Sequence, residues 1–429
     1  MTAAIIVTVM FILLGLGMPV AFALAAAGSA GLYWIGGTDA LTGIVTTTPL
    51  STAGTYELIS VPLFILMAEF VILSGVADNL FKAATCWVGR LPGGLAMATA
   101  LAGAGFGAIS GSSTASAATL SSTTIPAMLK AGYEPQLAGG VVAISGTLAM
   151  LIPPSIALVL FGIIADVSIS QLLVAGVIPG LLVTATIMAT VWYLVWRVPA
   201  RAPLGSAYTW RDKFTSLKVV GPMLVLFMAV TGVIYTGVAT PTEASGIGAF
   251  GAFVLALKAG TVNRKTLPAA LMRALQASTM IVMIIVCAKI FGYFFSLTQS
   301  TQQIVAWVGG LDTSRWVIMA LILFGYIVLG CLMDQIAILI LTVPVVLPLI
   351  KSLGFDPVWF GVVIVVTAEI GLVTPPVGLN VFVVSRYTGR PLSEVFAGVW
   401  PHVLAHLALL VVLVAFPQII LWLPSTMRF

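Results

Sequence analysis

The sequence has very little charge. Asp, Glu, Lys and Arg together make up 7% of the 429 residues, whereas hydrophobic residues make up 60%. A soluble domain carries about 25% charged residues, so water cannot be the solvent for most of this surface. Apolar segments close to the ~20 residues that a bilayer core requires recur along the whole chain, and no segment large enough for a soluble domain remains. The composition predicts an all-α polytopic membrane protein, with the lipid bilayer and not a nucleic acid as its partner.

Cysteine and histidine are also scarce. Cys86, Cys287 and Cys331 share no CxxC or CxxxC spacing, so neither a metal site nor a disulfide framework is indicated. His402 and His406 are four residues apart but lack the glutamate of the HExxH zinc motif. This favours a hydrogen-bonded pair within a helix over a metal site. With neither a metal-ligand set nor a Ser–His pair evident, the sequence does not predict an enzyme.

The N-terminus lacks the two marks of a secretory signal peptide. It reads Met-Thr-Ala-Ala-Ile-Ile, with no basic segment, and no small-residue cleavage site follows. We therefore expect the first apolar segment to be a retained span.

The chain contains an internal repeat. Residues 126–179 align with residues 348–401 without a gap at an offset of 222, and twelve of the 54 pairs are identical. The Pro-Pro pairs of the two segments match, as do three other prolines and several glycines, and outside the segment Pro19 meets Pro241 at the same offset. Biased composition alone would not easily align these residues. Repeats of this kind define the architecture. We predict repeat 1 at 1–197, a linker at 198–216 and repeat 2 at 217–429.

Each repeat contains five apolar spans and one polar-tipped pair of short apolar pieces. The spans lie near 3–17, 19–35, 58–75, 137–165 and 172–196 in repeat 1, and near 217–237, 241–259, 274–297, 358–386 and 394–422 in repeat 2. The pairs lie within 92–131 and 314–352. Pieces of about 16 residues reach roughly 24 Å, short of the ~30 Å hydrocarbon core. Two re-entrant hairpins fit this length better than full spans, although two tilted short helices remain an alternative.

The placement of lysine and arginine tests this topology. Five spans and a returning hairpin in each copy invert the second repeat relative to the first, which puts fourteen cations on one face and three on the other, with Lys289 inside a span. The fourteen are Lys82, Arg90, Lys130, Arg197, Arg201, Arg211, Lys213, Lys218, Lys258, Arg264, Lys265, Arg273, Arg386 and Arg390. Positive residues mark the cytoplasmic side. We therefore predict about ten transmembrane helices, two inverted repeats and two periplasmic termini.

Four places have the character of a transport site, because inverted repeats with broken helices bind substrates and ions where the backbone is unwound. The first is the polar tip Ile109–Ser116 of hairpin one, which reads Ile-Ser-Gly-Ser-Ser-Thr-Ala-Ser. Its hydroxyls and exposed carbonyls suit a hard cation, and helix N-termini at the tip favour an anion. Close packing of small residues is the alternative, but it explains glycine and alanine better than serine.

The second place is the Pro-Pro pair within 151–155. Two prolines remove two backbone donors, so nearby carbonyls lose their helical partners and become available as ligands. Ser145 and Thr147 lie within two turns of this break. A purely mechanical kink is the alternative.

The third and fourth places are the equivalents in repeat 2: the tip of hairpin two at 331–335 and a second break at 373–380. Asp334 aligns with Ser112. An acidic residue in a membrane hairpin is a functional hypothesis by default, and the alternative is a carboxylate exposed at the mouth of the hairpin. Glu69, Glu243, Lys289 and Glu369 are the other ionisable residues expected inside spans. Glu69 and Lys289 occupy equivalent positions, but a direct ion pair is a weaker hypothesis than separate partners or contacts with another subunit.

At these four places the chain resembles the large membrane subunit of TRAP (tripartite ATP-independent periplasmic) transporters. The resemblance rests on the glycine-rich run from Gly103 to Ser113, on Ile152-Pro-Pro-Ser155 and on Thr374-Pro-Pro-Val-Gly378, and it covers the whole chain. It implies a sodium-driven importer in the bacterial inner membrane that works as an elevator, with a transport domain moving against a fixed scaffold. It also implies a small four-helix membrane subunit, a periplasmic substrate-binding protein and a small organic acid as substrate.

The resemblance further implies two or more coupling sodium ions, one held by hairpin one with the first break and another by hairpin two with the second break. Ser110, Gly111, Ser113, Ser145, Gly146 and Ile152 are the candidates for the first ion. Asp334, Gln335, Thr367, Thr374 and Gly378 are the candidates for the second. Ser112, Ser113, Asp334 and Asn380 are the candidate substrate contacts.

Two other readings remain open. A stand-alone ion-coupled anion carrier or antiporter would share the inverted repeats and hairpins, and transport without a binding protein would favour it. An intramembrane enzyme would need an assembled catalytic pair or metal-ligand set, which this sequence does not display. The identity of the substrate cannot be read from the chain.

Overall fold

The computed structural model describes residues 2–205, 207–310 and 312–427, and every regular element within them is a helix. The α-helices are α1 (Thr2–Gly15), α2 (Val20–Ala53), α3 (Ser60–Leu73), α4 (Val76–Val88), α5 (Gly94–Ser110), α6 (Ser113–Lys130), α7 (Pro135–Thr147), α8 (Ile156–Ala165), α9 (Ile169–Ala175), α10 (Val177–Arg197), α11 (Trp210–Tyr235), α12 (Pro241–Lys258), α13 (Thr266–Leu297), α14 (Ser300–Gly309), α15 (Arg315–Leu332), α16 (Gln335–Ser352), α17 (Pro357–Gly371), α18 (Leu379–Thr388), α19 (Leu392–Ala415) and α20 (Gln418–Ser425). Short 3-10 turns occupy Tyr56–Ile59, Leu148–Met150 (η2) and Pro199–Arg201. Eight helical stretches are long and apolar enough to cross a membrane, so the chain is an all-helical membrane protein.

Two helix pairs occupy the predicted hairpins, α5 with α6 and α15 with α16. Gly111 reverses the chain between α5 and α6 in the left-handed region (φ 57°), and the Ser112 hydroxyl accepts a hydrogen bond from the Ala115 amide to cap α6. Asp334 caps α16 in the same way through the amide of Ile336. These helices have 17 or 18 residues, or about 26 to 27 Å. They are longer than the 16 residues expected, so length alone does not separate re-entrant hairpins from tilted spans.

The backbone leaves the helix at both Pro-Pro pairs. α7 ends at Thr147 and α8 begins at Ile156, while α17 ends at Gly371 and α18 begins at Leu379. The Pro153–Pro154 and Pro375–Pro376 peptide bonds are both cis. The two breaks differ in burial, because the prolines of the first are buried and those of the second are exposed.

Two helix pairs join the two halves of the sequence. α2 packs along α13, and α3 packs along α12. Small residues allow the first approach: a Cβ atom on Gly28 would lie 2.9 Å from the Cα of Phe291, and Gly31 faces the ring of Phe294. Close approach at small residues is the usual way in which helices associate within a membrane. The hairpins and broken helices form a second group, in which α5 and α6 pack on α7, α6 on α18, and α16 on α8.

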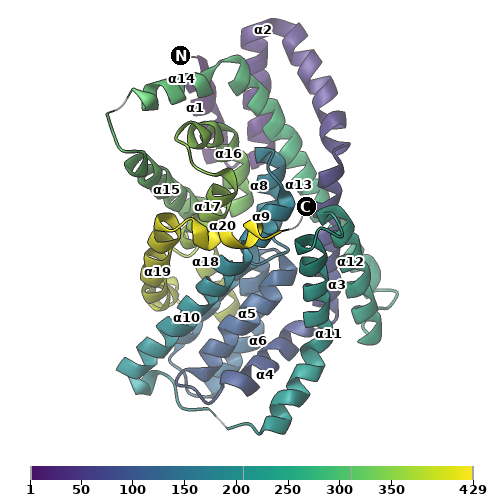
Figure 1. Ribbon diagram of the computed structural model, residues 1–429, viewed down its shortest axis with the longest axis vertical. Helices are drawn as coiled ribbons and strands as arrows, with labels where there is room; N and C mark the ends of the chain where they lie inside the picture. The colour runs from purple at the N-terminus through teal and green to yellow at the C-terminus, as the bar shows by residue number, and fades with distance from the viewer. Residues whose placement is uncertain (1, 206, 311, 428–429) are drawn as a thin grey trace.

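Several helical segments extend beyond the predicted spans. α2 continues to Ala53 after a kink at Gly37 (φ 65°), α13 begins at Thr266, and α4 and α14 follow the third span of each repeat. In Figure 1, α14 and the N-terminal end lie at one end of the molecule, whereas α4 and the start of α11 lie toward the other. α20 lies across the middle of this view, so the view assigns the C-terminal end to neither side.

Glu243 is not buried within a span. It is exposed in the first turn of α12, where its carboxylate accepts hydrogen bonds from the amide (2.8 Å) and hydroxyl (2.9 Å) of Thr240. The Thr240 hydroxyl in turn accepts from the Glu243 amide, which completes a capping box. The prediction that Glu243 is an intramembrane charge is therefore wrong, because the residue serves the helix N-terminus.

Candidate functional site

The tip of hairpin one is a buried cluster of hydroxyl groups. Ser113 and Ser116 have no exposed surface, and Ser110 is nearly as buried. The Ser110 and Ser116 hydroxyls lie 2.6 Å apart, so they satisfy each other. Ser112 is partly buried at the cap of α6. The cluster is therefore polar, largely buried and held in place by α5 and α6.

Asn380 joins hairpin one to the second break. Its Nδ2 group donates to the Ser113 hydroxyl at 2.7 Å and to the carbonyl of Ala143 on α7 at 3.2 Å. Asn380 lies in the first turn of α18 and is fully buried. One side chain of repeat 2 thus contacts two helices of repeat 1.

Gln335 makes the corresponding contact in the other half. Its Nε2 group donates to the carbonyl of Val365 on α17 at 3.3 Å. Val365 aligns with Ala143, and Gln335 aligns with Ser113, both at the offset of 222. An amide therefore binds the same helix position in both repeats, once from a broken helix and once from a hairpin tip.

Three buried oxygen atoms near these contacts have no hydrogen-bond partner in the described part of the chain. Asn380 Oδ1, Gln335 Oε1 and the hydroxyl of Ser145 are buried and have no hydrogen-bond partner among the described residues. An unsatisfied buried polar atom costs about 1–3 kcal/mol, so each needs an explanation. Amide and hydroxyl oxygens are the ligands that hard cations prefer. The orphaned atoms thus fit one cation near Ser145 and Asn380 and another near Gln335.

The candidates for the first sodium ion are only partly brought together. A Cβ atom on Gly146 would lie 3.0 Å from the carbonyl oxygen of Ser113, so α6 and α7 meet at this point. Ser145 is the neighbour of Gly146, and Gly111 packs against Ile156 at the start of α8. Ile152 packs instead against Gly180 of α10.

The candidates for the second ion form two groups. Gly378, in the left-handed region (φ 56°), lies beside the Thr374 carbonyl oxygen, 3.4 Å from the position of a Cβ atom. The Thr374 and Thr367 hydroxyls donate within α17, to Ile370 at 2.6 Å and to Val363 at 2.7 Å. Their oxygen lone pairs remain available as acceptors. Asp334 and Gln335 come from the tip of hairpin two, and Gln335 contacts α17 at Val365.

Asp334 lines the largest described cavity, of about 770 Å³, which we call the Asp334 cavity. Its other walls come from the start of α2, including Phe22, and from Gln276, Thr279 and Met283 of α13. The cavity therefore separates the long helices from the tip of hairpin two. Asp334 is its only charged lining residue among those described.

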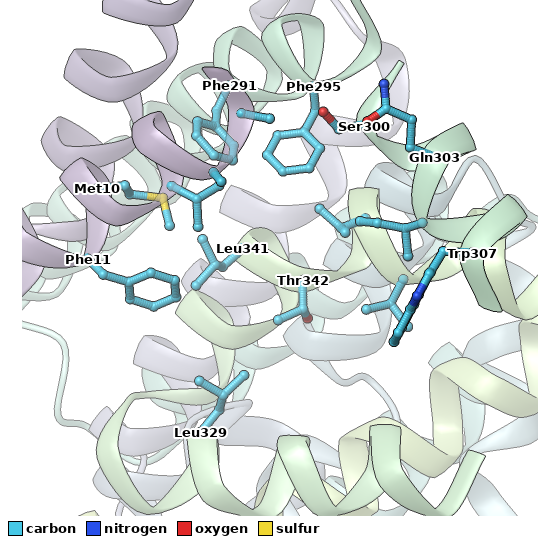
Figure 2. Close-up of a pocket in the computed structure, with 16 residues that line it drawn as sticks. Met10, Phe11, Phe291, Phe295, Ser300, Gln303, Trp307, Leu329, Leu341 and Thr342 are labelled. Carbon is cyan, nitrogen blue, oxygen red and sulfur yellow. The ribbon is translucent and has the colours of Figure 1, made fainter. Parts of the chain in front are cut away.

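A second cavity, of about 570 Å³, is apolar. Figure 2 shows Met10 and Phe11 of α1, Phe291 and Phe295 of α13, and Leu341 of α16 around it. None of the predicted site residues lines it. It is a gap between α1, α13, α14 and hairpin two, and it does not carry the candidate site.

Glu69 and Lys289 do not pair. Arg273 of α13 donates from Nε to Oε2 of Glu69 on α3 at 2.7 Å. The expectation of separate partners is therefore right for Glu69. Lys289 lines a different, smaller cavity of about 250 Å³. The sequence analysis missed Arg273 as the partner, although its place inside an apolar helix was a usable signal.

Three further buried groups lie outside the candidate ion and substrate sites. Glu369 on α17 is 3% exposed, and its Oε1 atom has no partner among the described residues. His406 Nδ1 lies 2.7 Å from the carbonyl oxygen of His402, but both ring nitrogens of His402 are unpartnered in the described structure. The expected histidine pair is thus only half satisfied. The sequence analysis also missed the Ala143 and Val365 carbonyls, because nothing in an alanine or valine marks a backbone acceptor.

Comparison with known proteins gives a consistent result. Residues 7–419 match the family model described as "Tripartite ATP-independent periplasmic transporter, DctM component". The chain is 34% identical over 371 residues to the C4-dicarboxylate TRAP transporter large permease protein DctM of Pseudomonas aeruginosa, covering 86% of each chain. It is 31% identical over 377 residues to the isethionate TRAP transporter permease protein DctMQ of Oleidesulfovibrio alaskensis, covering 85% of this chain and 57% of that longer one.

A solved structure shares the fold. The crystal structure of the Alcanivorax borkumensis YdaH transporter superposes with a TM-score of 0.64 at 16% identity, covering 89% of this chain and 90% of that one. This likeness concerns the fold alone. The family match extends over nearly the whole chain, and the sequence is that of a transporter permease and not an enzyme. The chain belongs to the DctM family, the large permease component of tripartite ATP-independent periplasmic transporters.

Proposed function

We propose that this chain imports a small organic acid by sodium-coupled secondary transport, after a periplasmic binding protein has delivered the acid. The observation that carries the proposal is the set of buried, unpartnered oxygens at Ser145, Gln335 and Asn380. Sodium is a hard cation, and secondary transporters hold it with unwound backbone and helix ends at broken helices. When bound, the ions supply the positive charge and the downhill gradient that drive uptake of an anion.

The residues of the chain divide the work. The amide nitrogen of Asn380 donates to α7, and the amide nitrogen of Gln335 donates to α17. The amide oxygen of each side chain points the other way and is therefore free to bind a cation. Asp334 supplies negative charge at the face of its cavity. Ser112 and Ser113, at the opposite hairpin tip, remain with Asp334 the substrate contacts that we propose from the sequence. Asn380, also a candidate contact from the sequence, is proposed here as a cation ligand instead, because its Nδ2 group is already bonded to Ser113 and Ala143.

We assign the scaffold to the long helices and the moving domain to the hairpins and breaks. α2 packs on α13, and α3 packs on α12, so each contact joins a helix of repeat 1 to a helix of repeat 2. Together these contacts form a rigid frame that spans both repeats. The hairpins pack on the broken helices as a separate group. This division fits an elevator mechanism, in which the domain that carries the substrate moves against a fixed frame. In the topology that we propose, both termini are periplasmic and the lysine- and arginine-rich ends of the helices are cytoplasmic.

The relatives support the partners and the kind of substrate. C4-dicarboxylates and isethionate are both small organic acids, and they appear in the names of two relatives. The name DctMQ of the longer relative indicates that it joins two permease components in one chain. We propose that a separate small four-helix subunit fills the second role here.

The test is uptake into proteoliposomes that contain this chain, its small subunit and its binding protein. Candidate acids such as succinate and isethionate are supplied with sodium outside, and choline replaces sodium in the control. Uptake should require sodium and the binding protein. Undiminished uptake on a proton gradient alone would overturn the sodium assignment, and uptake without the binding protein would favour a stand-alone carrier.

A further inference from the structure

Lys289 is a cation within a transmembrane helix that has no counter-charge in the described structure. No carboxylate of the described residues lies within 4.0 Å of its ammonium group, since the three ion pairs involve other residues. A charge in a membrane span is expensive and normally faces a partner or a watered cavity. Lys289 therefore calls for an anion from outside the chain.

The cavity beside Lys289 is suited to one. This cavity, which we call the Lys289 cavity, has a volume of about 250 Å³. Three hydroxyl-bearing residues, Tyr293, Ser296 and Thr301, line it, and no acidic residue lines it among those described. An ammonium group beside several hydroxyl groups can bind a carboxylate with charge-assisted hydrogen bonds.

The position of the cavity connects it with transport. Lys289 and its neighbours belong to α13, whereas Pro344 comes from α16 of hairpin two and Ile164 from the end of α8. The cavity thus lies between a long helix and two elements of the proposed moving domain. Tyr293 and Ser296 are exposed, so the cavity reaches the surface of the protein.

The charge of the Lys289 cavity is opposite to that of the Asp334 cavity. Both cavities border α13. Met283 lines the Asp334 cavity and Gly292 lines the Lys289 cavity. These residues are nine positions apart, about two and a half turns, so the two cavities lie on opposite sides of the helix. An organic anion is repelled by the Asp334 carboxylate until a cation joins it, whereas it is attracted at once by Lys289.

We propose that the Lys289 cavity is a binding site for the carboxylate of the transported organic acid. The proposal rests on the function proposed above and names a contact for its substrate. Lys289 holds the anion through one ammonium group and neighbouring hydroxyls, next to the boundary that the moving domain crosses. It is a binding residue, distinct from the ion ligands of the hairpin tips.

The first test measures anion attraction without transport. Ser296→Cys is introduced into the full chain after Cys86, Cys287 and Cys331 have been replaced by alanine. The thiol is labelled with an anionic methanethiosulfonate ethylsulfonate or with neutral methyl methanethiosulfonate. Adding Lys289→Met should lower the ratio of the two rates by about twofold or more, the factor for unit charges roughly 10 Å apart in bulk water, since residues 289 and 296 are two helical turns apart. Lys289→Arg should keep the ratio, and so should Lys258→Met, which removes an exposed lysine at the end of α12.

Competition identifies the source of the anion. Succinate or isethionate should slow labelling in lipid-free detergent micelles. Protection by phosphatidylglycerol nanodiscs but not by either acid would assign the site to lipid headgroups and overturn the proposal. Protection only when the small subunit is co-purified would assign Lys289 to a subunit contact and overturn it equally. A rate ratio that is unchanged by Lys289→Met would also end it.

The second test measures uptake in the complete reconstituted system. Lys289→Met should raise the apparent KM for the acid about tenfold or more, as expected for a lost charge-assisted bond, and Lys289→Arg should recover most of it. A KM unchanged in Lys289→Met, with sodium-driven uptake intact, would overturn the site but leave the proposed function standing. An absence of uptake by the wild-type system would count against the proposed function. The labelling ratio would still show whether Lys289 attracts anions, because that measurement does not need transport.

Discussion

Asn380 and Ser113 lie 267 residues apart in the sequence, and their side chains are joined by a hydrogen bond of 2.7 Å. The bond fastens the first turn of the second broken helix to the tip of the first hairpin. A cation ligand at Asn380 Oδ1 would therefore respond to the position of hairpin one. This coupling across the repeats leads to the first prediction.

Asn380→Leu should reduce the apparent affinity of uptake for sodium by about tenfold or more. The substitution removes both the unpartnered Oδ1 atom and the hydrogen bond from Nδ2 to Ser113. Ser113→Ala should have a smaller effect of the same kind. The double mutant should be less impaired than the two effects added, since both single mutants break one bond. Sodium titration of uptake measures all three variants. Strictly additive losses would show that Ser113 and Asn380 do not act as a unit.

Asp334→Asn should impair transport severely and leave the fold intact. Asn is as good a helix cap as Asp, so the bond from the Ile336 amide (3.1 Å) survives while the charge is lost. Asp334→Ala should also cost about 1 kcal/mol of stability through loss of the cap. Melting in detergent and uptake in proteoliposomes separate the two roles. Wild-type rates in Asp334→Asn would place the carboxylate outside the transport site.

Glu69 and Arg273 should stabilise the contact between α3 and α13 as a pair. The Arg273 side chain is 50% exposed and that of Glu69 is 15% exposed, so solvent screening limits the pair to about 1 kcal/mol or less. Glu69→Gln and Arg273→Met should each lower the melting temperature in detergent, and the double mutant should recover part of the loss. Glu69→Gln combined with Lys289→Met should show no such recovery. Recovery with Lys289 and none with Arg273 would reverse the assignment.

Gly398→Ala should be strongly destabilising. α19 crosses α7 so closely at this glycine that a Cβ atom would overlap the carbonyl oxygen of Gln136. Overpacking at such a crossing costs about 1–3 kcal/mol or more. Gly221→Ala is the matched control, because it lies in α11 with nothing within 4 Å of the added atom and alanine favours a helix. Equal melting temperatures for Gly398→Ala and wild type would contradict the tight crossing.

The sequence predicted most of the membrane helices because their signal is local. A run of apolar residues, a Pro-Pro pair and a serine-rich tip each act on their own backbone, and the structure has helices, breaks and turns at these places. The segment 36–53, the amphipathic α4 and α14 were missed since none is apolar enough to read as a span. Glu243 was misjudged because a carboxylate at the start of an apolar helix serves equally as a cap.

The candidate site was less predictable because its contacts are not local. The alignment at offset 222 pairs Asn380 with Leu158, so the repeat gave no hint that Asn380 would bind Ser113 and Ala143. The resemblance to the family implied one ion at each hairpin with its own break, and the structure adds contacts between the repeats, because α6 packs on α18 and α16 packs on α8. Cross-repeat contacts depend on how two copies are placed in space, and no pattern within one copy encodes that.

The packing of α2 on α13 and of α3 on α12, across the two repeats, has a consequence for biosynthesis. When α2 leaves the ribosome its glycines have nothing to pack against, since Phe291 and Phe294 follow more than 260 residues later. At about 5–20 residues per second, α2 waits on the order of 13 to 50 seconds for its partner. During that time neither repeat can close into a finished unit, so the frame of the transporter is completed only when α13 is in the membrane. A chain that stops between the two repeats therefore lacks the packing partners of α2 and α3, even though all the spans of its first repeat are present.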